Sequence, residues 1–186
     1  MRNTLRATTA LAAVLLAGAA VRGAARASDD DDHGGKSRGP EFSTRLSGAN
    51  EVPPVDTDTT GKAEISFNSD QTKMEFELSV RKGVRVTQSH IHCAPKGVNG
   101  PIVVFLAGFH NRGWDVDGRW VQNATATDDN VIPPAAGSTC PVPLNNLRDL
   151  VAAIKQGNAY VNVHTIAHPG GEARGQLQRD DDDDDH

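Results

Sequence analysis

The residues best suited to chemistry are three histidines in two segments that alternate like β-strands. His90 and His92 are separated by one residue, so in a strand their imidazoles point to the same face, about 7 Å apart. His164 has the same polar-face position in a later segment, where Glu172 is expected opposite it. Three imidazoles suit zinc or copper and leave a coordination position open. The sequence thus predicts a metal site at these histidines, with Glu172 beside His164; the alternative is that they form structural hydrogen bonds.

Cys93 and Cys140 are the two cysteines of the chain. In an exported protein an even pair is more often a disulfide than two free thiols. We therefore expect a Cys93–Cys140 bridge that ties the irregular stretch before Cys140 to the strands. The alternative is that Cys93 is a metal ligand beside His92.

Trp114 and Trp120 flank Asp117-Gly118, a dipeptide typical of a two-residue hairpin. At that spacing both indoles point to the same face. They would form an aromatic platform for a sugar or a partner protein, or else cover one edge of a small core.

Motifs of nucleophilic and phosphate chemistry are missing from the sequence. There is no Gly-x-Ser-x-Gly elbow, and the glycine-containing turn at 97–100 precedes a strand instead of opening a helix. No catalytic residues are therefore assigned, and the protein is expected not to be an enzyme.

Alternation with a period of two residues predicts the strands that position these side chains. Apolar and polar positions alternate over 62–67 and 73–80, whereas 101–106 is a short apolar run. Apolar residues at helical spacing predict one short helix over 147–154. Strands of this length, bounded by turn residues, are typical of an antiparallel sandwich or barrel. We expect one all-β domain over residues 41–179.

The last two expected strands, 159–164 and 172–178, are regular enough for their register to be predicted. Antiparallel pairing across the intervening loop sets Asn162 opposite Arg174. One face is then apolar throughout and the other polar throughout, so the register is consistent. The histidines should lie on the polar face, outside the apolar layer.

Both ends of the chain have compositions unlike that of the domain. Residues 1–27 combine early arginines, an apolar stretch and a small-x-small cleavage pattern, and so predict a secretory signal peptide. That stretch is about half as long as a membrane-spanning helix. Residues 28–40 and 180–186 contain runs of aspartate and are expected to be disordered. These ends would keep the protein soluble or bind calcium loosely. We expect a secreted or periplasmic protein that does not span the membrane.

The distribution of charge argues against a nucleic-acid partner. The chain has a net charge of −5, which becomes −9 without the four arginines of the leader. Ten of the acids belong to the two aspartate runs, so the domain itself is close to neutral, at about +1. A nucleic-acid-binding protein would normally carry a basic patch or stripe.

Several motifs resemble the CHRD domain, which occurs in chordin and in exported bacterial proteins. They follow one another in the family order over about residues 43–177: LSGANEVPPV at 46–55, SHIHC at 89–93, GVNGPIV at 97–103, YVNVHT at 160–165 and PGGEARGQ at 169–176. The resemblance implies an immunoglobulin-like or superoxide-dismutase-like antiparallel β-sandwich outside the cytoplasm.

The function implied by this resemblance is a non-enzymatic extracytoplasmic binding or matrix module, because the chordin domain belongs to a secreted antagonist of a growth factor. The partner would be a protein or an extracellular polymer. The His-x-His pair is also similar to the copper-binding arrangement of Cu,Zn superoxide dismutase. This similarity supports the alternative function, a copper- or zinc-binding protein that is redox-active or simply holds the ion.

Overall fold

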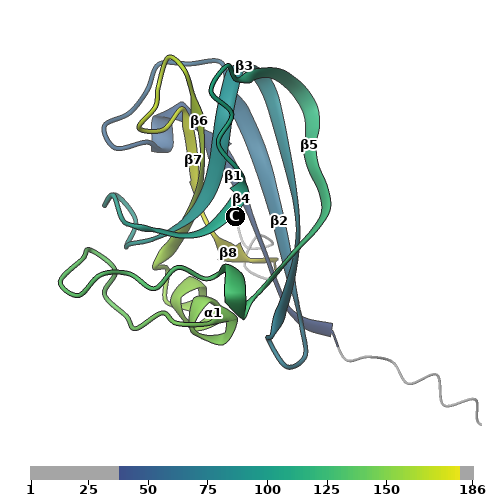
Figure 1. The fold of residues 1–186 in the computed structure, drawn as a ribbon. Helices are drawn as coiled ribbons and strands as arrows, with labels where there is room; N and C mark the ends of the chain where they lie inside the picture. The colour runs from purple at the N-terminus through teal and green to yellow at the C-terminus, as the bar shows by residue number, and fades with distance from the viewer. Residues whose placement is uncertain (1–37, 181–186) are drawn as a thin grey trace, which may run out of the picture. The chain divides into compact units, whose positions relative to one another are not determined.

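The structure is a computed structural model and describes residues 38–180. In this part of the chain a single α-helix accompanies eight strands (Figure 1). The strands are β1 (Arg38–Ser47), β2 (Thr60–Asn68), β3 (Lys73–Cys93), β4 (Ile102–Ala107), β5 (Trp114–Thr127), β6 (Ala159–Thr165), β7 (Ala173–Gln176) and β8 (Gln178–Arg179). The helices are α1 (Leu147–Lys155) and two short 3-10 turns, η1 (Gly48–Asn50) and η2 (Asp128–Asn130).

Five strands close into an antiparallel barrel. The order is β1-β7-β6-β3-β2, and β2 pairs again with β1. β4 and β5 add to β3, and β8 adds to β1. The expectation of an all-β domain with one short helix is confirmed, but the two-sheet immunoglobulin-like or superoxide-dismutase-like sandwich is not what the strands form.

The barrel closes because β3 is long enough to serve two sheets. Its first half pairs with β2, and its second half pairs with β6. Between the halves, Lys82 and Arg85 have positive φ angles, and the pairing with β5 shifts register there. Such irregularities bend a strand. One bent strand therefore joins the two layers that the sequence suggested would be separate.

The predicted register of the last two strands is confirmed. Asn162 lies opposite Arg174, and the pairing continues in both directions as expected. The predicted helix is also present, with Asn146 accepting a hydrogen bond from the Asp149 amide at its start. The hairpin expected between Trp114 and Trp120 is wrong, because both belong to the single strand β5.

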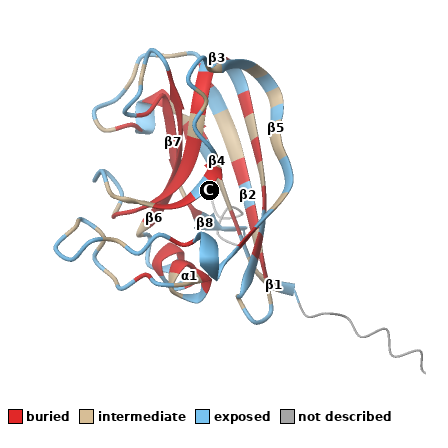
Figure 2. Ribbon diagram, viewed as in Figure 1, coloured by how far each residue is buried: buried red, intermediate tan, exposed pale blue. Residues whose placement is uncertain are grey.

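The apolar core fills the barrel and continues under α1 (Figure 2). The inward-facing residues of β2 and of the first half of β3 are buried, whereas the alternate residues are partly or fully exposed. In β6 every residue is buried. The Cys93–Cys140 disulfide is confirmed, with 5.0 Å between the Cα atoms, so Cys93 is not a metal ligand.

Most of the two chain ends lie outside the described residues. This applies to the expected signal peptide at 1–27, to residues 28–37 and to the tail at 181–186, including the candidate calcium-binding aspartates. Arg38 to Pro40, which we had expected to be disordered, already belong to β1. Between residues 38 and 180 no helix has the length and apolar character needed to cross a membrane.

Candidate metal centre

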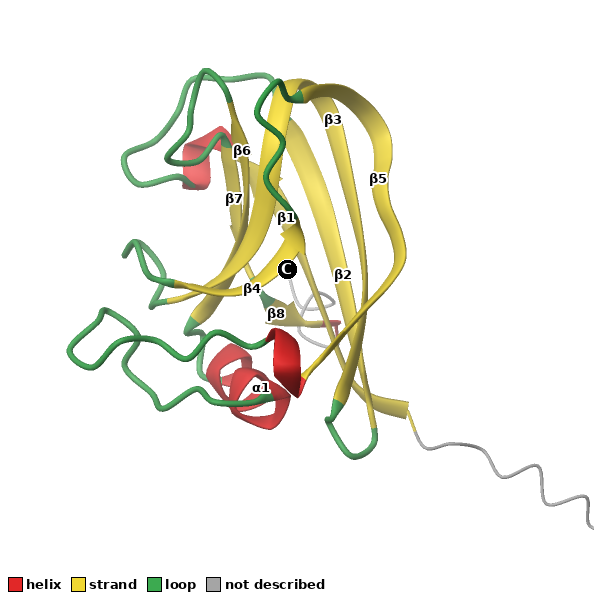
Figure 3. Cartoon of the chain, in the orientation of Figure 1, coloured by secondary structure: helices red, strands yellow, loops and turns green. Residues whose placement is uncertain are grey.

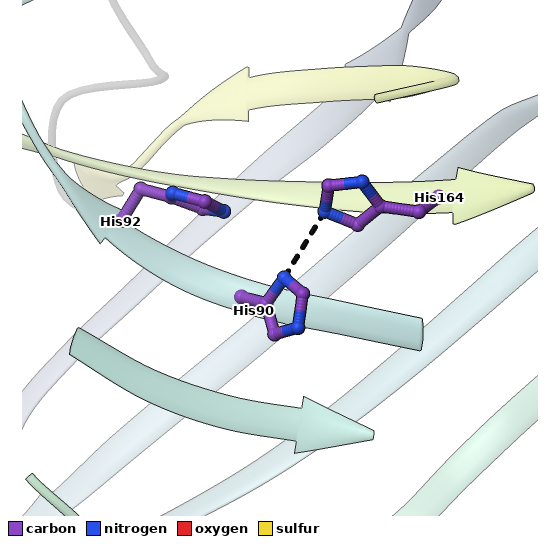
Figure 4. A group of neighbouring side chains, drawn as sticks. All are labelled: His90, His92 and His164. Carbon is purple, nitrogen blue, oxygen red and sulfur yellow. Dashed lines mark hydrogen bonds between the residues drawn. The ribbon is translucent and has the colours of Figure 1, made fainter. Parts of the chain in front are cut away.

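The three histidines gather on the outer face of the barrel, where β3 and β6 run side by side. His90 and His92 come from β3, and His164 comes from β6 (Figure 4). His90 lies opposite Asn162, and His92 lies opposite Tyr160. The strand alternation correctly placed all three imidazoles on one face, away from the apolar layer.

This polar face is buried, which the sequence did not indicate. His90 is 0% exposed, His92 7% and His164 5%. Loops contribute to the cover: the chain after η1 places Glu51 there, the turn after β3 places Gly100 there, and the turn before β7 places Pro169 there (Figure 3). The histidines therefore form a polar layer between the barrel and its loops.

The imidazole nitrogens are close enough to share an ion. One nitrogen from each of His90, His92 and His164 lies within 4.8 Å of the others. His90 Nδ1 and His164 Nε2 are 3.0 Å apart. Bonds of about 2 Å to one metal require donor atoms about 3.4 Å apart. Small side-chain movements would bring the three donors to that spacing.

Backbone hydrogen bonds determine which nitrogens are available. His92 Nδ1 donates to Gly100 O at 2.8 Å, and His164 Nδ1 donates to Pro169 O at 2.9 Å. In the neutral rings, the proton is then on Nδ1 and the lone pair is on Nε2. A hydrogen bond to the second ring nitrogen is the usual means of orienting a metal-binding histidine.

Among the described residues, two nitrogens of this layer are buried and form no hydrogen bond within 3.5 Å. They are Nε2 of His90 and Nε2 of His92. Since His164 Nε2 carries a lone pair, His90 Nδ1 donates the hydrogen bond between them, which leaves the His90 Nε2 lone pair unused. Buried polar atoms normally find a partner, so two unpartnered lone pairs in one cluster require an explanation.

All three imidazoles are held neutral. Burial, together with His164 and His92, lowers the pKa of His90 to about 3. Burial, together with His164, lowers the pKa of His92 to about 4, although hydrogen bonds to Gly100 and Asn162 oppose the shift. Burial also lowers the pKa of His164, although the hydrogen bond to Pro169 opposes the shift. Neutral imidazole is the form that binds metal ions. At pH 7 none of the three rings carries a second proton that a metal ion would have to displace.

A three-layer stack supports His92 from the side. The His92 ring lies parallel to the Tyr160 ring, at 6° and 4.8 Å between centroids. The Arg174 guanidinium lies over the Tyr160 ring, 3.4 Å from its centroid. It donates hydrogen bonds to Val98 O and Asn99 Oδ1. Arg174 is 2% exposed. It stabilises the layer as a buried cation over an aromatic ring.

Glu172 lies near the cluster but has other partners. Thr57, Thr165 and His168 all donate hydrogen bonds to its carboxylate. Burial raises its pKa, but these hydrogen bonds outweigh burial and the pKa is lowered overall. Among the described residues, no hydrogen bond joins Glu172 to His164. The expected His164–Glu172 pair is therefore not seen; β7 begins one residue later, at Ala173.

The sequence analysis did not identify Glu51 as part of this layer. Its carboxyl is 6% exposed, and one oxygen has no partner. Burial raises its pKa to about 7, with Arg174 and Asn162 opposing the shift. Gly171, at a φ of +142°, leaves no room for a side chain against this carboxyl. In the sequence, Glu51 is marked only by its place in the motif NEVPP, one of the motifs that resemble the CHRD domain.

Trp114 and Trp120 lie apart from the metal candidate, on β5. Their ring centroids are 6.4 Å apart, and His110 stacks on Trp114 at 3.8 Å. Trp114 is 47% exposed, whereas Trp120 packs partly against the core. The two indoles are neighbours, as expected, but Trp120 packs partly against the core.

Comparison with protein families gives one match. The family model described as CHRD domain matches residues 42–177. The matched segment includes β1 to β7 almost entirely and all three histidines. Comparisons with curated proteins and with solved structures give no match.

Proposed function

The chain belongs to the CHRD domain family, and from this premise we propose that it is an exported, non-enzymatic protein that binds a copper or zinc ion. The ligands are His90, His92 and His164. The observation that carries the proposal is the buried cluster of three neutral imidazoles with two unpartnered lone pairs. The ion would hold the loops of a binding or matrix module whose partner is a protein or an extracellular polymer.

The disulfide supports a location outside the cytoplasm. Disulfides persist in oxidising compartments and are rare where thiols are kept reduced. The Cys93–Cys140 bridge joins the end of β3 to a distant loop. Together with the signal-like N-terminus, this supports secretion or retention in a periplasm.

A metal explains the cluster better than structural hydrogen bonding does. If the histidines served only to form hydrogen bonds, the lone pair of His92 Nε2 would remain unsatisfied in a buried layer. Leaving a buried polar atom unsatisfied costs about 1–3 kcal/mol. A bound ion would take up the lone pairs of His92 Nε2 and His164 Nε2, and it would bind His90 through Nδ1, whose proton moves to Nε2 of the same ring.

Burial favours holding an ion over transforming a substrate. A catalytic metal needs an open position that a substrate can reach. The three histidines are nearly inaccessible, and the Phe105 ring packs edge-on against His90 at 4.6 Å. The site therefore supports binding, storage or a structural role of the metal.

The charges around the cluster favour copper in its monovalent state over zinc. The donors are three neutral rings, and no carboxylate from the described part of the chain completes the set. The buried guanidinium of Arg174 lies over the Tyr160 ring, which stacks on His92, and so adds positive charge close to the site. The cost of burying an uncompensated ion rises steeply with its charge. Three imidazoles also suit copper, and the site thus fits Cu(I) better than Zn(II).

The direct test is metal analysis of the purified full chain after loading with Cu(I) or Zn(II) and removal of excess metal. We expect one equivalent of Cu(I), bound at least tenfold more tightly than Zn(II). His92→Asn should abolish this binding, because the shorter amide still reaches Gly100 O but offers no Nε2. His110→Ala is the matched control, a histidine outside the cluster, and should retain the equivalent.

The tails provide an internal check on the stoichiometry. Both aspartate runs are followed by a histidine, His33 and His186, and both remain in the His92→Asn variant. If that variant still holds one equivalent of copper, the ion is bound elsewhere and the proposal is wrong. Absence of stoichiometric copper from the parent chain would reject it as well.

A further inference from the structure

We propose that a second site, a basic cleft on the outer face of β2, β1 and β7, binds a short acidic saccharide. The cleft has a volume of about 520 Å³, within the range of small-ligand pockets. Its cationic lining residues are Arg45, Lys62, Lys96 and Arg174.

The strand register explains why these cations meet. Arg45 on β1 lies opposite Lys62 on β2, and on its other side Ser47 of the same strand lies opposite Arg174 on β7. Side chains two residues apart on a strand share a face, so Arg45 and Arg174 point to the same side of the barrel. Lys96 is added from the turn after β3.

The positive charge of the cleft is poorly compensated. Among residues 38–180, no carboxylate lines the cleft. In the described part of the chain, Lys62 forms an exposed ion pair with Glu64, whereas neither Arg45 nor Lys96 forms one. Arg174 donates to the uncharged Val98 O and Asn99 Oδ1 and also interacts with the Glu51 carboxyl. The uncompensated charge of the cleft therefore comes from Arg45 and Lys96. A concave surface lined by one sign of charge attracts the opposite charge.

The remaining lining residues indicate what else the ligand carries. Three are amides, Asn50, Gln176 and Gln178, and two are hydroxyls from β1. Amides and hydroxyls both donate and accept hydrogen bonds, as sugar hydroxyls do. The lining includes no aromatic ring and no aliphatic side chain larger than that of threonine. A ligand that combines carboxylates with many hydroxyls, such as a uronic-acid oligosaccharide, fits this lining best.

The chain's own acidic tail is a less suitable occupant. β8 runs antiparallel to β1, from Gln178 opposite Ser43 to Arg179 opposite Phe42. Its continuation therefore leads away from Arg45. Asp180 lines a different hollow with Glu41 and Glu64. Asp180, the described aspartate at this end of the chain, thus lies away from Arg45 and in a different hollow.

Calorimetric titration of the full chain with trigalacturonate tests the proposal, in low salt and with EDTA so that no metal takes part. We expect one ligand per chain with a dissociation constant below about 1 mM. The methyl ester of trigalacturonate, which keeps the hydroxyls and loses the charges, should bind at least tenfold more weakly. Arg45→Gln and Lys96→Gln should each weaken binding about three- to tenfold.

Lys73→Gln is the matched control, since Lys73 is an exposed lysine on β3 that does not line the cleft. It should leave the dissociation constant unchanged. Three results would overturn the proposal: no binding of trigalacturonate, an equal loss in Lys73→Gln, or equally tight binding of a hexa-aspartate peptide. The last result would show that charge alone is recognised. None of these results bears on the histidine site, because the titration contains no metal.

Discussion

The two halves of β3 have the same alternating pattern but different surroundings. In the first half, residues 73–80, apolar side chains face the core and the alternate side chains reach solvent. In the second half, residues 86–93, nearly every residue is buried on both faces. Apolar side chains face the core in both halves, at even-numbered positions in the first and at Ile91 and Cys93 in the second, after the register shifts near residues 80–88. The polar face changes from a solvent-exposed surface to a closed layer containing His90 and His92. Alternation therefore predicts which side a residue faces, whereas the loops decide whether that side is covered.

The largest expected effect on the free energy of unfolding comes from removing the Cys93–Cys140 disulfide, which anchors the end of the second half of β3. Replacing both Cys93 and Cys140 by alanine removes a link across 47 residues. The chain-entropy model then predicts a loss of about 4 kcal/mol in the free energy of unfolding. Urea unfolding of the parent and the double variant, both without metal, measures it. A loss below about 1 kcal/mol would show that the loop before Cys140 is held mainly by packing.

The next largest effect is a dependence of the unfolding free energy on pH, caused by Glu51 in the loop that covers the second half of β3. Its pKa is raised to about 7 in the folded chain, from 4.5. The folded state then binds the proton more tightly, so this stabilisation is complete below pH 4.5 and is lost as the pH rises to about 7. The loss is up to about 3 kcal/mol.

Comparison with Glu51→Gln isolates this contribution, because the histidines affect both proteins equally. The low pKa values of His90 and His92 act in the opposite direction and reduce stability below pH 6.5. We expect the variant to gain stability relative to the parent between pH 5 and pH 8, measured by unfolding in the presence of chelator. A difference independent of pH would mean that Glu51 is ionised and solvated.

The smallest effect compares one outward-facing residue from each half. Without metal, His90→Leu should change the unfolding free energy by no more than about 1 kcal/mol. It loses a hydrogen bond to His164 but removes an unsatisfied buried nitrogen. Glu77→Gln, in the open half, should change it by less than about 0.5 kcal/mol.

Copper should separate these two variants. An excess of Cu(I) of about a thousandfold over the dissociation constant stabilises the parent by about 4 kcal/mol. Glu77→Gln should keep this gain and His90→Leu should lose it, as read from thermal unfolding with and without copper. An equal gain in both variants would place the ion outside the histidine cluster.

Local rules made much of this molecule predictable from its sequence. The register of β6 and β7 followed from alternation together with the length of the loop between them, because a one-residue slip would mix apolar and polar side chains on each face. The helix followed from the spacing of its leucines, and the disulfide followed from an even number of cysteines. The grouping of His90, His92 and His164 followed from two strands whose polar faces coincide.

Features that depend on distant segments were not predictable. Barrel closure requires the bend near Lys82, which no short pattern announces. The Asp117-Gly118 dipeptide suggested a hairpin, but pairing with β3 keeps β5 in one piece. Glu172 was expected to pair with His164, yet Thr57, a residue 115 positions away, provides one of its hydrogen bonds. The basic cleft similarly combines residues from three strands and a turn.

X-ray absorption at the copper edge of the Cu(I)-loaded full chain tests the central claim most directly, because it reports the atoms bound to the ion. We predict three nitrogen neighbours at about 2 Å with the outer-shell pattern of imidazole, and loss of this spectrum in His92→Asn. A shell of oxygen atoms would contradict the claim and indicate carboxylate ligands, and an unchanged spectrum in His92→Asn would contradict it by showing that the ion is bound without His92.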